Sequence, residues 1–261
     1  MSLATKAAII TGSTSGIGLG VATALAEAGA NVMLNGFGDR ADIERVRADL
    51  AARTGVDVRY SAADMSDPVS VMAMVAEAEA AFGRVDILVN NAGIQHVAAI
   101  ESFPADRWHK ILAINLSSNF FAMQAVIPGM KARGFGRIIN VASAHGLVGS
   151  PFKSAYVAAK HGQVGLTKVA ALELAETGIT VNAVCPGYVR TPLVEGQIAD
   201  QMKAHSLGRD EVIKTVILGS QPNKRFVEVE EMGAVVAFLC STAAQSITGI
   251  ALPVDGAWTA R

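Results

Sequence analysis

Short apolar runs alternate with helical patterns along most of the chain, and this alternation limits the possible folds more than any other feature. The first run, Ala7-Ala8-Ile9-Ile10, is apolar at every position. Continuously apolar runs are typical of strands covered on both faces, as in parallel sheets with helices packed on each side. The sequence therefore predicts an α/β fold with one doubly wound parallel sheet of about seven strands and helices on both faces.

The apolar runs have the length and composition of strands. They lie at residues 7–10, 31–35, 56–61, 85–89, 137–142, 179–184 and 250–254. Helices are expected between them, at about 19–29, 41–54, 69–82, 108–133 and 154–176. Polar helical segments replace this rhythm near 191–225, which predicts a helical lid over the substrate site. No repeat, low-complexity tract or linker divides the chain, so residues 1–261 are expected to form a single domain.

The composition is unusually apolar: hydrophobic residues make up 51%, charged residues make up 17%, and the mean hydropathy is +0.36. A membrane span or an interface between copies of the chain would each explain this. The apolar run 233–240 is far shorter than the roughly 20 residues that cross a bilayer. We therefore expect no membrane partner and a homo-oligomer whose subunits cover part of the apolar surface.

Charge and cysteine content argue against several other classes of protein. A net charge of -1 and an isoelectric point near 6.5 give no basic surface for nucleic acid, so small molecules and sister subunits are the expected partners. Cys185 and Cys240 show neither metal-site spacing nor a disulfide framework, so we expect buried structural thiols and no metal. The N-terminus has no signal-peptide pattern, and a reduced, cytoplasmic setting is expected.

A glycine-rich turn, Thr11-Gly12-Ser13-Thr14-Ser15-Gly16-Ile17-Gly18, follows the first strand. Glycines at a strand-to-helix turn let the backbone approach a pyrophosphate, and the free N–H groups at the helix start attract negative charge. The spacing G-x-x-x-G-x-G differs from the G-x-G-x-x-G of the common dinucleotide fingerprint. Taken alone, the segment fits a structural turn as well as a dinucleotide site.

The end of the second strand is where a dinucleotide site distinguishes NAD from NADP. An acidic residue there suits a ribose 2′-hydroxyl, and a basic residue suits a 2′-phosphate. The segment Asn35 to Gly38 offers neither, and no arginine or lysine stands at Ser15 or Phe37. We therefore expect NAD as the cofactor. Arg40 is the residue that could reverse this preference.

Two other strands end in residues that suit a nucleotide. Asp64 follows the third strand and could accept a hydrogen bond from an adenine amino group, or it could cap the Ser66-Asp67-Pro68 turn. Asn90-Asn91-Ala92-Gly93 follows the fourth strand. Small and amide residues there allow close contact with a cofactor, but they also form ordinary turns.

Ser143, Tyr156 and Lys160 form a candidate proton-transfer group. Tyr156 and Lys160 are four residues apart and would share one face of a helix. An ammonium group beside a phenol favours the phenolate, so such a tyrosine can move protons near neutral pH. Ser143, in the preceding loop, could hydrogen-bond the oxygen of a reacting alcohol or carbonyl. The same spacing also occurs on amphipathic helix edges that have no catalytic role.

In this order and spacing, the motifs resemble those of the short-chain dehydrogenase/reductase family, whose fold is Rossmann-like. The resemblance covers essentially the whole chain and also includes Asn115, Pro186-Gly187 and Thr191. It implies that Tyr156 is the general acid/base and that Lys160 lowers its pKa and holds the nicotinamide ribose. Ser143 would position the substrate oxygen, and Asn115 would continue a proton relay through water to Lys160.

The resemblance also implies which residues bind NAD. They lie mainly in the loops that follow the strands. The expected set is Gly12, Thr14, Ser15, Gly16, Ile17, Gly18, Phe37, Asp64, Met65, Asn91, Ala92, Gly93, Tyr156, Lys160, Pro186, Gly187, Val189 and Thr191.

Within the family, the chain is most similar to bacterial dehydrogenases of D-3-hydroxybutyrate, which hold the substrate carboxylate with a polar set of side chains. The residues matching that set are Gln95, His145, Lys153 and Gln197, and the other expected substrate contacts are Ser143, Tyr156, Tyr188 and Trp258. A carboxylate removed from water needs charged or hydrogen-bonding partners, so these residues indicate a small hydroxy or keto acid substrate. Tyr188 stands where the subgroup is expected to have tryptophan, and Ala257 replaces a second glycine.

The resemblance therefore implies reversible, NAD-dependent conversion of (R)-3-hydroxybutyrate into acetoacetate by a cytoplasmic homotetramer. Its interfaces would be the helices that carry Asn115 and Tyr156. One alternative is an NADPH-dependent 3-oxoacyl reductase, or another short-chain dehydrogenase. Another is a non-catalytic dinucleotide-binding regulator, against which the intact Ser143, Tyr156 and Lys160 set argues.

Overall fold

The computed structural model describes residues 2–260, so positions 1 and 261 of the expected domain lie outside the described residues. The side chains of 193, 200, 204 and 205 are not described either. One parallel sheet has the strand order β3-β2-β1-β4-β5-β6-β7. Its strands are β1 Ala7–Ile10, β2 Asn31–Asn35, β3 Val58–Ser61, β4 Ile87–Asn90, β5 Gly136–Val141, β6 Ile179–Pro186 and β7 Ala251–Val254. The predicted doubly wound sheet is confirmed.

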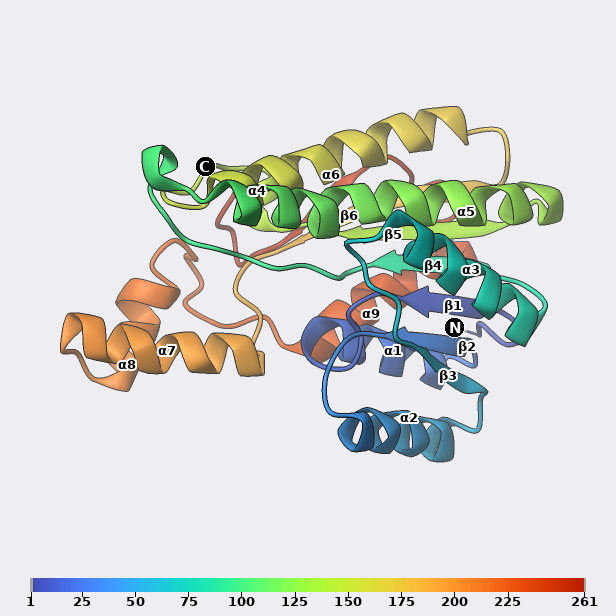
Figure 1. Cartoon of the computed structure of the whole chain (residues 1–261), viewed down its shortest axis with the longest axis horizontal. Coiled ribbons are helices and arrows are strands. Elements are labelled where there is room, and N and C mark those ends of the chain that lie inside the picture. The colour runs from blue at the N-terminus through green and yellow to red at the C-terminus, as the bar shows by residue number, and fades with distance from the viewer. Residues whose placement is uncertain (1, 261) are drawn as a thin grey trace.

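Helices cover both faces of this sheet (Figure 1). The helices α3, α5 and α6 lie on one face, and α1, α2 and α9 lie on the other. The helices are α1 Gly16–Glu27, α2 Arg40–Thr54, α3 Pro68–Phe82, α4 Ala105–Leu112, α5 Ser118–Arg133, α6 Ser154–Glu173, α7 Pro192–His205, α8 Arg209–Glu211 and α9 Val229–Cys240. The helices α7 and α8 extend beyond the end of the sheet, within the 191–225 segment where the regular rhythm was expected to break.

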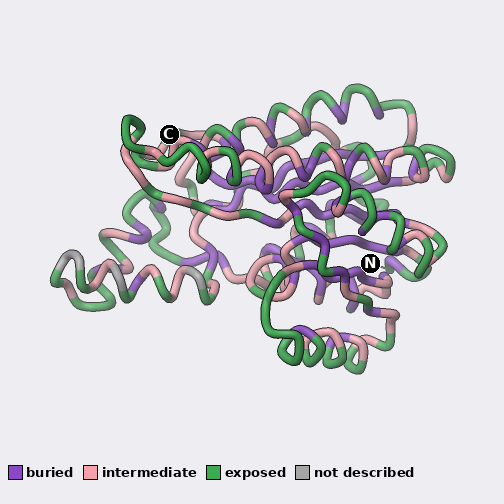
Figure 2. Tube along the Cα trace, viewed as in Figure 1, coloured by how far each residue is buried: buried purple, intermediate pink, exposed green. Residues whose placement is uncertain are grey.

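The core consists of two apolar layers, one on each face of the sheet (Figure 2). Successive residues of β1 contribute to different layers. Ile10 belongs to the layer of Leu25 and Met232, which lie on α1 and α9, and Ile9 belongs to the layer of Met74 on α3. Because both faces are covered, the strand sequences are continuously apolar instead of alternating.

A π-helical turn joins α4 and α5 into one continuous helical segment, 105–133. By its length and composition alone, this segment could cross a membrane. In this fold it packs against α3 and α6. Its side chains Ile111, Val126 and Met130 are fully buried. The apolar character of this segment therefore serves the core.

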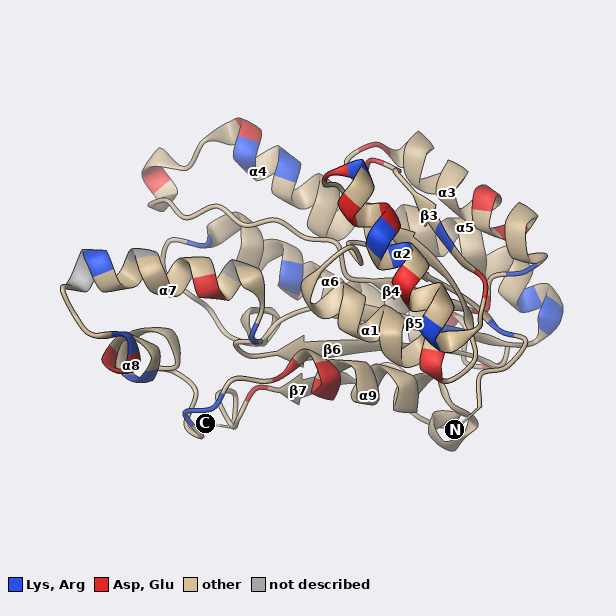
Figure 3. Cartoon of the chain, turned by 90° about the horizontal axis from the view of Figure 1, so that it is seen from below, with Lys and Arg blue, Asp and Glu red and all other residues tan. Residues whose placement is uncertain are grey.

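Charged residues of both signs are mixed on the surface (Figure 3). On α2, Asp42 pairs with Arg45, and Glu44 pairs with Arg47. Exposed pairs of this kind contribute at most about 1 kcal/mol each. The main attachment of α2 to the sheet is therefore apolar. It is made by Ile43 and Leu50, which are the buried residues of this helix.

The helix α9 has no counterpart among the expected elements. A capping box begins it, in which the backbone N–H of Glu228 donates to the Glu231 side chain at 2.8 Å. Glutamate takes the place of the serine or threonine that usually marks this motif. The helix packs on α1, where a Cβ added to Gly233 would lie 2.9 Å from the Ala24 Cβ and 2.9 Å from the Gly20 oxygen.

The close approach of α1 and α9 makes Gly233→Ala destabilising. The added methyl group would overlap α1, and we expect the free energy of unfolding in urea to fall by about 1–3 kcal/mol. The control is Gly196→Ala at an exposed position of α7, where a Cβ meets nothing within 4 Å. This control should gain up to about 1 kcal/mol from its lower unfolded-state entropy. Equal effects of the two substitutions would contradict the proposed helix contact.

Candidate active site

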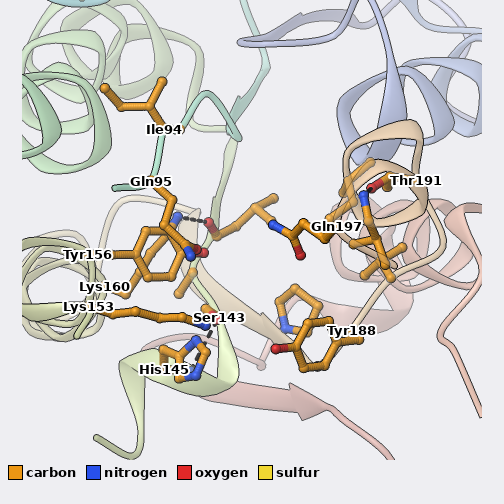
Figure 4. A pocket seen from close by; sticks show the side chains of 18 of the residues that line it. Ile94, Gln95, Ser143, His145, Lys153, Tyr156, Lys160, Tyr188, Thr191 and Gln197 are labelled. Carbon is orange, nitrogen blue, oxygen red and sulfur yellow. Dashed lines mark hydrogen bonds between the residues drawn. The ribbon is translucent and has the colours of Figure 1, made fainter. Parts of the chain in front are cut away.

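Loops at the carboxyl ends of the strands converge on a cavity of about 660 Å³. The strand order changes direction between β1 and β4, and ligands of doubly wound sheets bind outside the carboxyl ends at such a point. The predicted residues that line the cavity are Ile17, Asn91, Gly93, Gln95, Ser143, His145, Lys153, Tyr156, Lys160, Pro186, Gly187, Tyr188, Val189, Thr191, Gln197 and Trp258. Figure 4 shows Gln95, Lys153 and Tyr156 on one side and Tyr188, Thr191 and Gln197 on the other.

Hydrogen bonds join the glycine turn after β1 to the loop after β4. The Thr11 hydroxyl oxygen accepts from the backbone N–H groups of Asn91 and Ala92, each at 3.0 Å. The Asn91 side chain donates to the carbonyls of Thr11 and Gly12, each at 2.9 Å. A Cβ on Gly18 would collide with Gly12 and Asn91, so this position requires glycine. The amide N–H groups of Asn91 therefore serve the turn itself.

The start of α1 suits an anionic group. Its N-cap, Ser15, makes no side-chain capping bond, and its first turn has no acidic residue. By contrast, Asp39 and Asp67 cap α2 and α3 with their side chains. The N–H groups at the start of a helix carry partial positive charge, and Ile17 of this turn lines the cavity. These groups fit the pyrophosphate of a dinucleotide.

Thr14, Phe37 and Met65, which are expected to bind NAD, lie outside the cavity lining. Phe37 is 66% exposed just after β2, whereas Met65 is buried. A Cβ on Gly36 would lie 2.5 Å from the hydroxyl oxygen of Thr14, so Thr14 packs closely under this segment. Asn35 is buried, accepts from Gly12 N at 3.2 Å and donates to the carbonyls of Ser61 and Ala63. Its side chain therefore joins neighbouring strands.

Asp64 acts as a turn acceptor. One carboxylate oxygen accepts from the Ser66 backbone N–H at 2.8 Å and from the Ser66 hydroxyl at 2.7 Å. These bonds hold the pKa of Asp64 below its usual value. The interpretation of Asp64 as a cap of the turn is confirmed, and its contact with adenine stays a prediction.

On α6, Lys160 is buried and Tyr156, one turn before it, is half-buried. The Lys160 Nζ donates to the Val141 carbonyl at 2.8 Å and lies 5.6 Å from the Tyr156 ring centroid. Burial raises the pKa of Tyr156, which a hydrogen bond with Ser143 partly opposes, and burial lowers the pKa of Lys160 to about 7. Each group is thus moved toward its neutral form. Desolvation opposes both charged forms here, so the role of Lys160 in easing the ionisation of Tyr156 stays a prediction.

Asn115 lies in the π-helical turn between α4 and α5 and is fully buried. Its side chain accepts from the backbone N–H of Ile94 and donates to the Ile94 carbonyl, both at 2.9 Å. π-Helical turns often mark functional positions. Asn115 therefore fixes the loop that carries Gln95, and its expected relay through water to Lys160 stays a prediction.

Aromatic rings enclose the end of the cavity next to Tyr156. His145 makes edge contacts with Tyr156 and Trp258, at centroid distances of 6.1 Å and 5.0 Å. Tyr188 stacks on Trp258 at 5.9 Å and 6°. Burial and the charge of Lys153 lower the pKa of His145 to about 4, so its imidazole is neutral near pH 7. Lys153 is half-buried, and burial also lowers its pKa.

Trp258 is held by the turn that ends the chain. The carboxylate of Asp255 accepts from Ala257 N at 3.1 Å and from Thr259 N at 3.0 Å. Ala257 adopts a φ of 72°, which costs a side-chain-bearing residue about 1–2 kcal/mol relative to glycine. Alanine at this position therefore stores backbone strain next to Trp258.

A family model described as short chain dehydrogenase matches residues 6–202. The chain belongs to the short-chain dehydrogenase family. It is 53% identical over 98% of its length to the whole "D-beta-hydroxybutyrate dehydrogenase" of Rhizobium meliloti (strain 1021). It is 52% identical to the protein of the same name from Cupriavidus necator, with 98% of each chain covered. This short-chain dehydrogenase is therefore an oxidoreductase whose family uses NAD or NADP.

Solved structures support the same assignment of the fold. A variant of actinorhodin polyketide ketoreductase with NADPH matches this short-chain dehydrogenase with a TM-score of 0.90 and 35% identity, over 97% of each chain.

Several residues that shape the cavity were missed in the sequence. Ile94, His96 and Val97 line it beside Gln95, and only their nearness to the Asn-Ala-Gly turn could have indicated this. Gln221 is fully buried and accepts from Tyr188 N at 3.0 Å, so it positions the loop after β6. A single glutamine in a polar segment gives no sequence signal.

The neutral state of His145 gives a test by pH. The unfolded chain binds a proton near pH 6.5 that the folded protein binds only near pH 4, so stability is full above 6.5 and falls through this window. Between about pH 7 and about pH 4.5, His145→Gln should remove about 2–3 kcal/mol of the wild-type loss in unfolding free energy. His109→Gln, at an exposed position of α4, is the control and should keep that loss, because His145 and its neighbours are intact in it. An unchanged pH dependence in His145→Gln would refute the burial account.

Proposed function

We propose that this enzyme reversibly oxidises D-3-hydroxybutyrate to acetoacetate with NAD. The observation that carries the proposal is Lys153, which lines the same cavity as Tyr156 and acts electrostatically on His145. A carboxylate that leaves water needs a charged or hydrogen-bonding partner, and Gln95 and Gln197 line the cavity as well. Relatives that are 53% and 52% identical are named for this substrate.

In this proposal Tyr156 is the general acid/base of the reaction. Bound NAD supplies the acceptor for the hydride that leaves the substrate carbon. The hydroxyl proton of the substrate passes to the Tyr156 phenolate, and Ser143 hydrogen-bonds the same oxygen as it becomes a carbonyl. A positioned base of this kind typically contributes about 10²–10⁴-fold in rate. Lys160 would supply the positive charge that favours the phenolate, with the NAD ribose as its further partner.

NAD is proposed over NADP because positions 15 and 37 are serine and phenylalanine. Neither side chain carries the positive charge that would neutralise a 2′-phosphate. Arg40 begins α2 and is exposed, so it is the side chain that would favour NADP. The similarity to a ketoreductase with NADPH makes an NADPH-dependent 3-oxoacyl reductase the second candidate.

We also propose that the chain is a single domain in which residues 191–225 form a lid, and that it works as a cytoplasmic homotetramer. Val194 and Gln197 of α7 line the cavity, although α7 extends away from the sheet (Figure 1). Movement of α7 would therefore change access to the substrate end. The helices α5 and α6 would form the main interface of the tetramer.

Turnover with NAD and D-3-hydroxybutyrate tests the proposal, and Lys153→Met isolates its central contact. If Lys153 pairs with the carboxylate, kcat/KM for the hydroxy acid should fall about tenfold to a hundredfold, or about 1.5–3 kcal/mol. Oxidation of a neutral secondary alcohol should change little. Lys168→Met, at an exposed position of the same helix, is the matched control and should leave both activities unchanged.

Two results would count against this function. An equal loss on the acid and on the neutral alcohol would remove Lys153 from carboxylate binding. Faster turnover of NADPH with a 3-oxoacyl ester than of NAD with D-3-hydroxybutyrate would favour the reductase.

A further inference from the structure

Gln163 is a buried polar side chain beneath the cavity that has no part in the reaction described above. It lies three residues after Lys160 on α6 and is fully buried. Its Oε1 accepts a hydrogen bond from the Lys160 Nζ at 3.0 Å. Its Nε2 has no hydrogen-bond partner among residues 2–260.

An amide with half of its hydrogen bonding unmet is an unfavourable choice for a buried position. Methionine or leucine would fill a similar volume without an unpaired N–H group. Within the described residues, the bond from Lys160 is the one hydrogen bond that the Gln163 side chain makes. The benefit of a polar side chain here therefore concerns Lys160.

Lys160 lies where an ammonium group needs such acceptors. It is 3% exposed, and its Nζ donates to Val141 O and to Gln163 Oε1. The described titratable groups that face it are Tyr156 on α6 and Cys185 on β6. Burial raises the pKa of the Cys185 thiol to about 11, so this group carries no charge near neutral pH. Neither neighbour supplies a negative charge there, and the two carbonyl oxygens remain as acceptors.

A chain of buried hydrogen bonds fixes the backbone of Gln163. The Thr167 hydroxyl donates to the Gln163 carbonyl at 2.8 Å, and the Asn140 side chain on β5 donates to the Thr167 oxygen at 2.8 Å. The Asn90 side chain on β4 donates to Asn140 at 2.9 Å. The turn of α6 that carries Gln163 is therefore tied to the centre of the sheet.

We propose that Gln163 is a positioning residue for Lys160: its Oε1 holds Nζ in place and favours the ammonium form that Tyr156 needs as its neighbour. This inference rests on the proposed roles of Tyr156 and Lys160 in proton transfer. Hydrogen bonds to a charged form stabilise that form. Because Tyr156 and Lys160 are close, they titrate as a pair. The phenolate of Tyr156 is less favoured when Lys160 has lost its proton.

The test compares pH profiles of kcat/KM for hydroxybutyrate oxidation. In Gln163→Met the alkaline limb should move to lower pH by about one unit, which is a tenfold loss of activity above that limb, because Lys160 gives up its proton more readily. Activity on the acid side, where Lys160 stays protonated in both proteins, should not change. Thr167→Val is the control, because it cuts the buried chain but leaves the Lys160 acceptor. It should lower thermal stability without moving the limb. No shift in Gln163→Met, or the same shift in both variants, would overturn the proposal.

A second measurement needs neither substrate nor cofactor. Proteins grown with isotopically labelled lysine allow the Lys160 resonance to be titrated by NMR, with assignment by its loss in Lys160→Met. The pKa of Lys160 should fall by about one unit in Gln163→Met and stay unchanged in Thr167→Val. A wild-type enzyme inactive on hydroxybutyrate would refute the proposed substrate alone, and this titration would then decide the role of Gln163. An unchanged Lys160 pKa in Gln163→Met would overturn that role.

Discussion

Desolvation of a phenol and an amine on one turn of α6 is the constraint on which the candidate site depends. Desolvation raises the pKa of Tyr156 and lowers that of Lys160 to about 7, so the surroundings oppose the charges that proton transfer requires. Ser143 partly opposes this effect at Tyr156. Val141 and Gln163 accept hydrogen bonds from Lys160. The same low-polarity environment would strengthen the field of a bound, positively charged nicotinamide.

The loops around this pair are held by amide, hydroxyl and carboxylate side chains. Thr11 and Asn91 join the loops after β1 and β4, and Asn115 pairs with both backbone groups of Ile94. Gln221 accepts a hydrogen bond from the backbone of the loop after β6, and Asp255 accepts one from the backbone of the turn that carries Trp258. Because these bonds lie within the chain, the cavity is shaped before a ligand arrives, which lowers the entropy cost of binding.

Much of this arrangement could be predicted from sequence. The strands were predictable because continuous apolar runs such as Ile9-Ile10 follow directly from a sheet covered on both faces. The convergence of His145, Lys153 and Trp258 on one cavity was predicted only from the family resemblance. Sequence patterns could not bring these residues together, because they are far apart in the chain or lie in irregular loops. The helix α9 was not predicted, because its N-cap is Glu228 instead of the serine or threonine that usually marks a helix start. Gln163 was not predicted, because its role depends on how deeply this face of α6 is buried, and sequence periodicity does not reveal that.

Tyr156→Phe tests the central claim most directly, because it removes a single oxygen atom from the pair formed by Tyr156 and Lys160. The measurement is single-turnover oxidation of D-3-hydroxybutyrate, together with the Kd for NAD. If Tyr156 is the general base, the rate should fall by at least about 10²-fold while the Kd changes by less than about threefold. Retention of most of the wild-type rate would contradict the account, since proton transfer would then occur elsewhere.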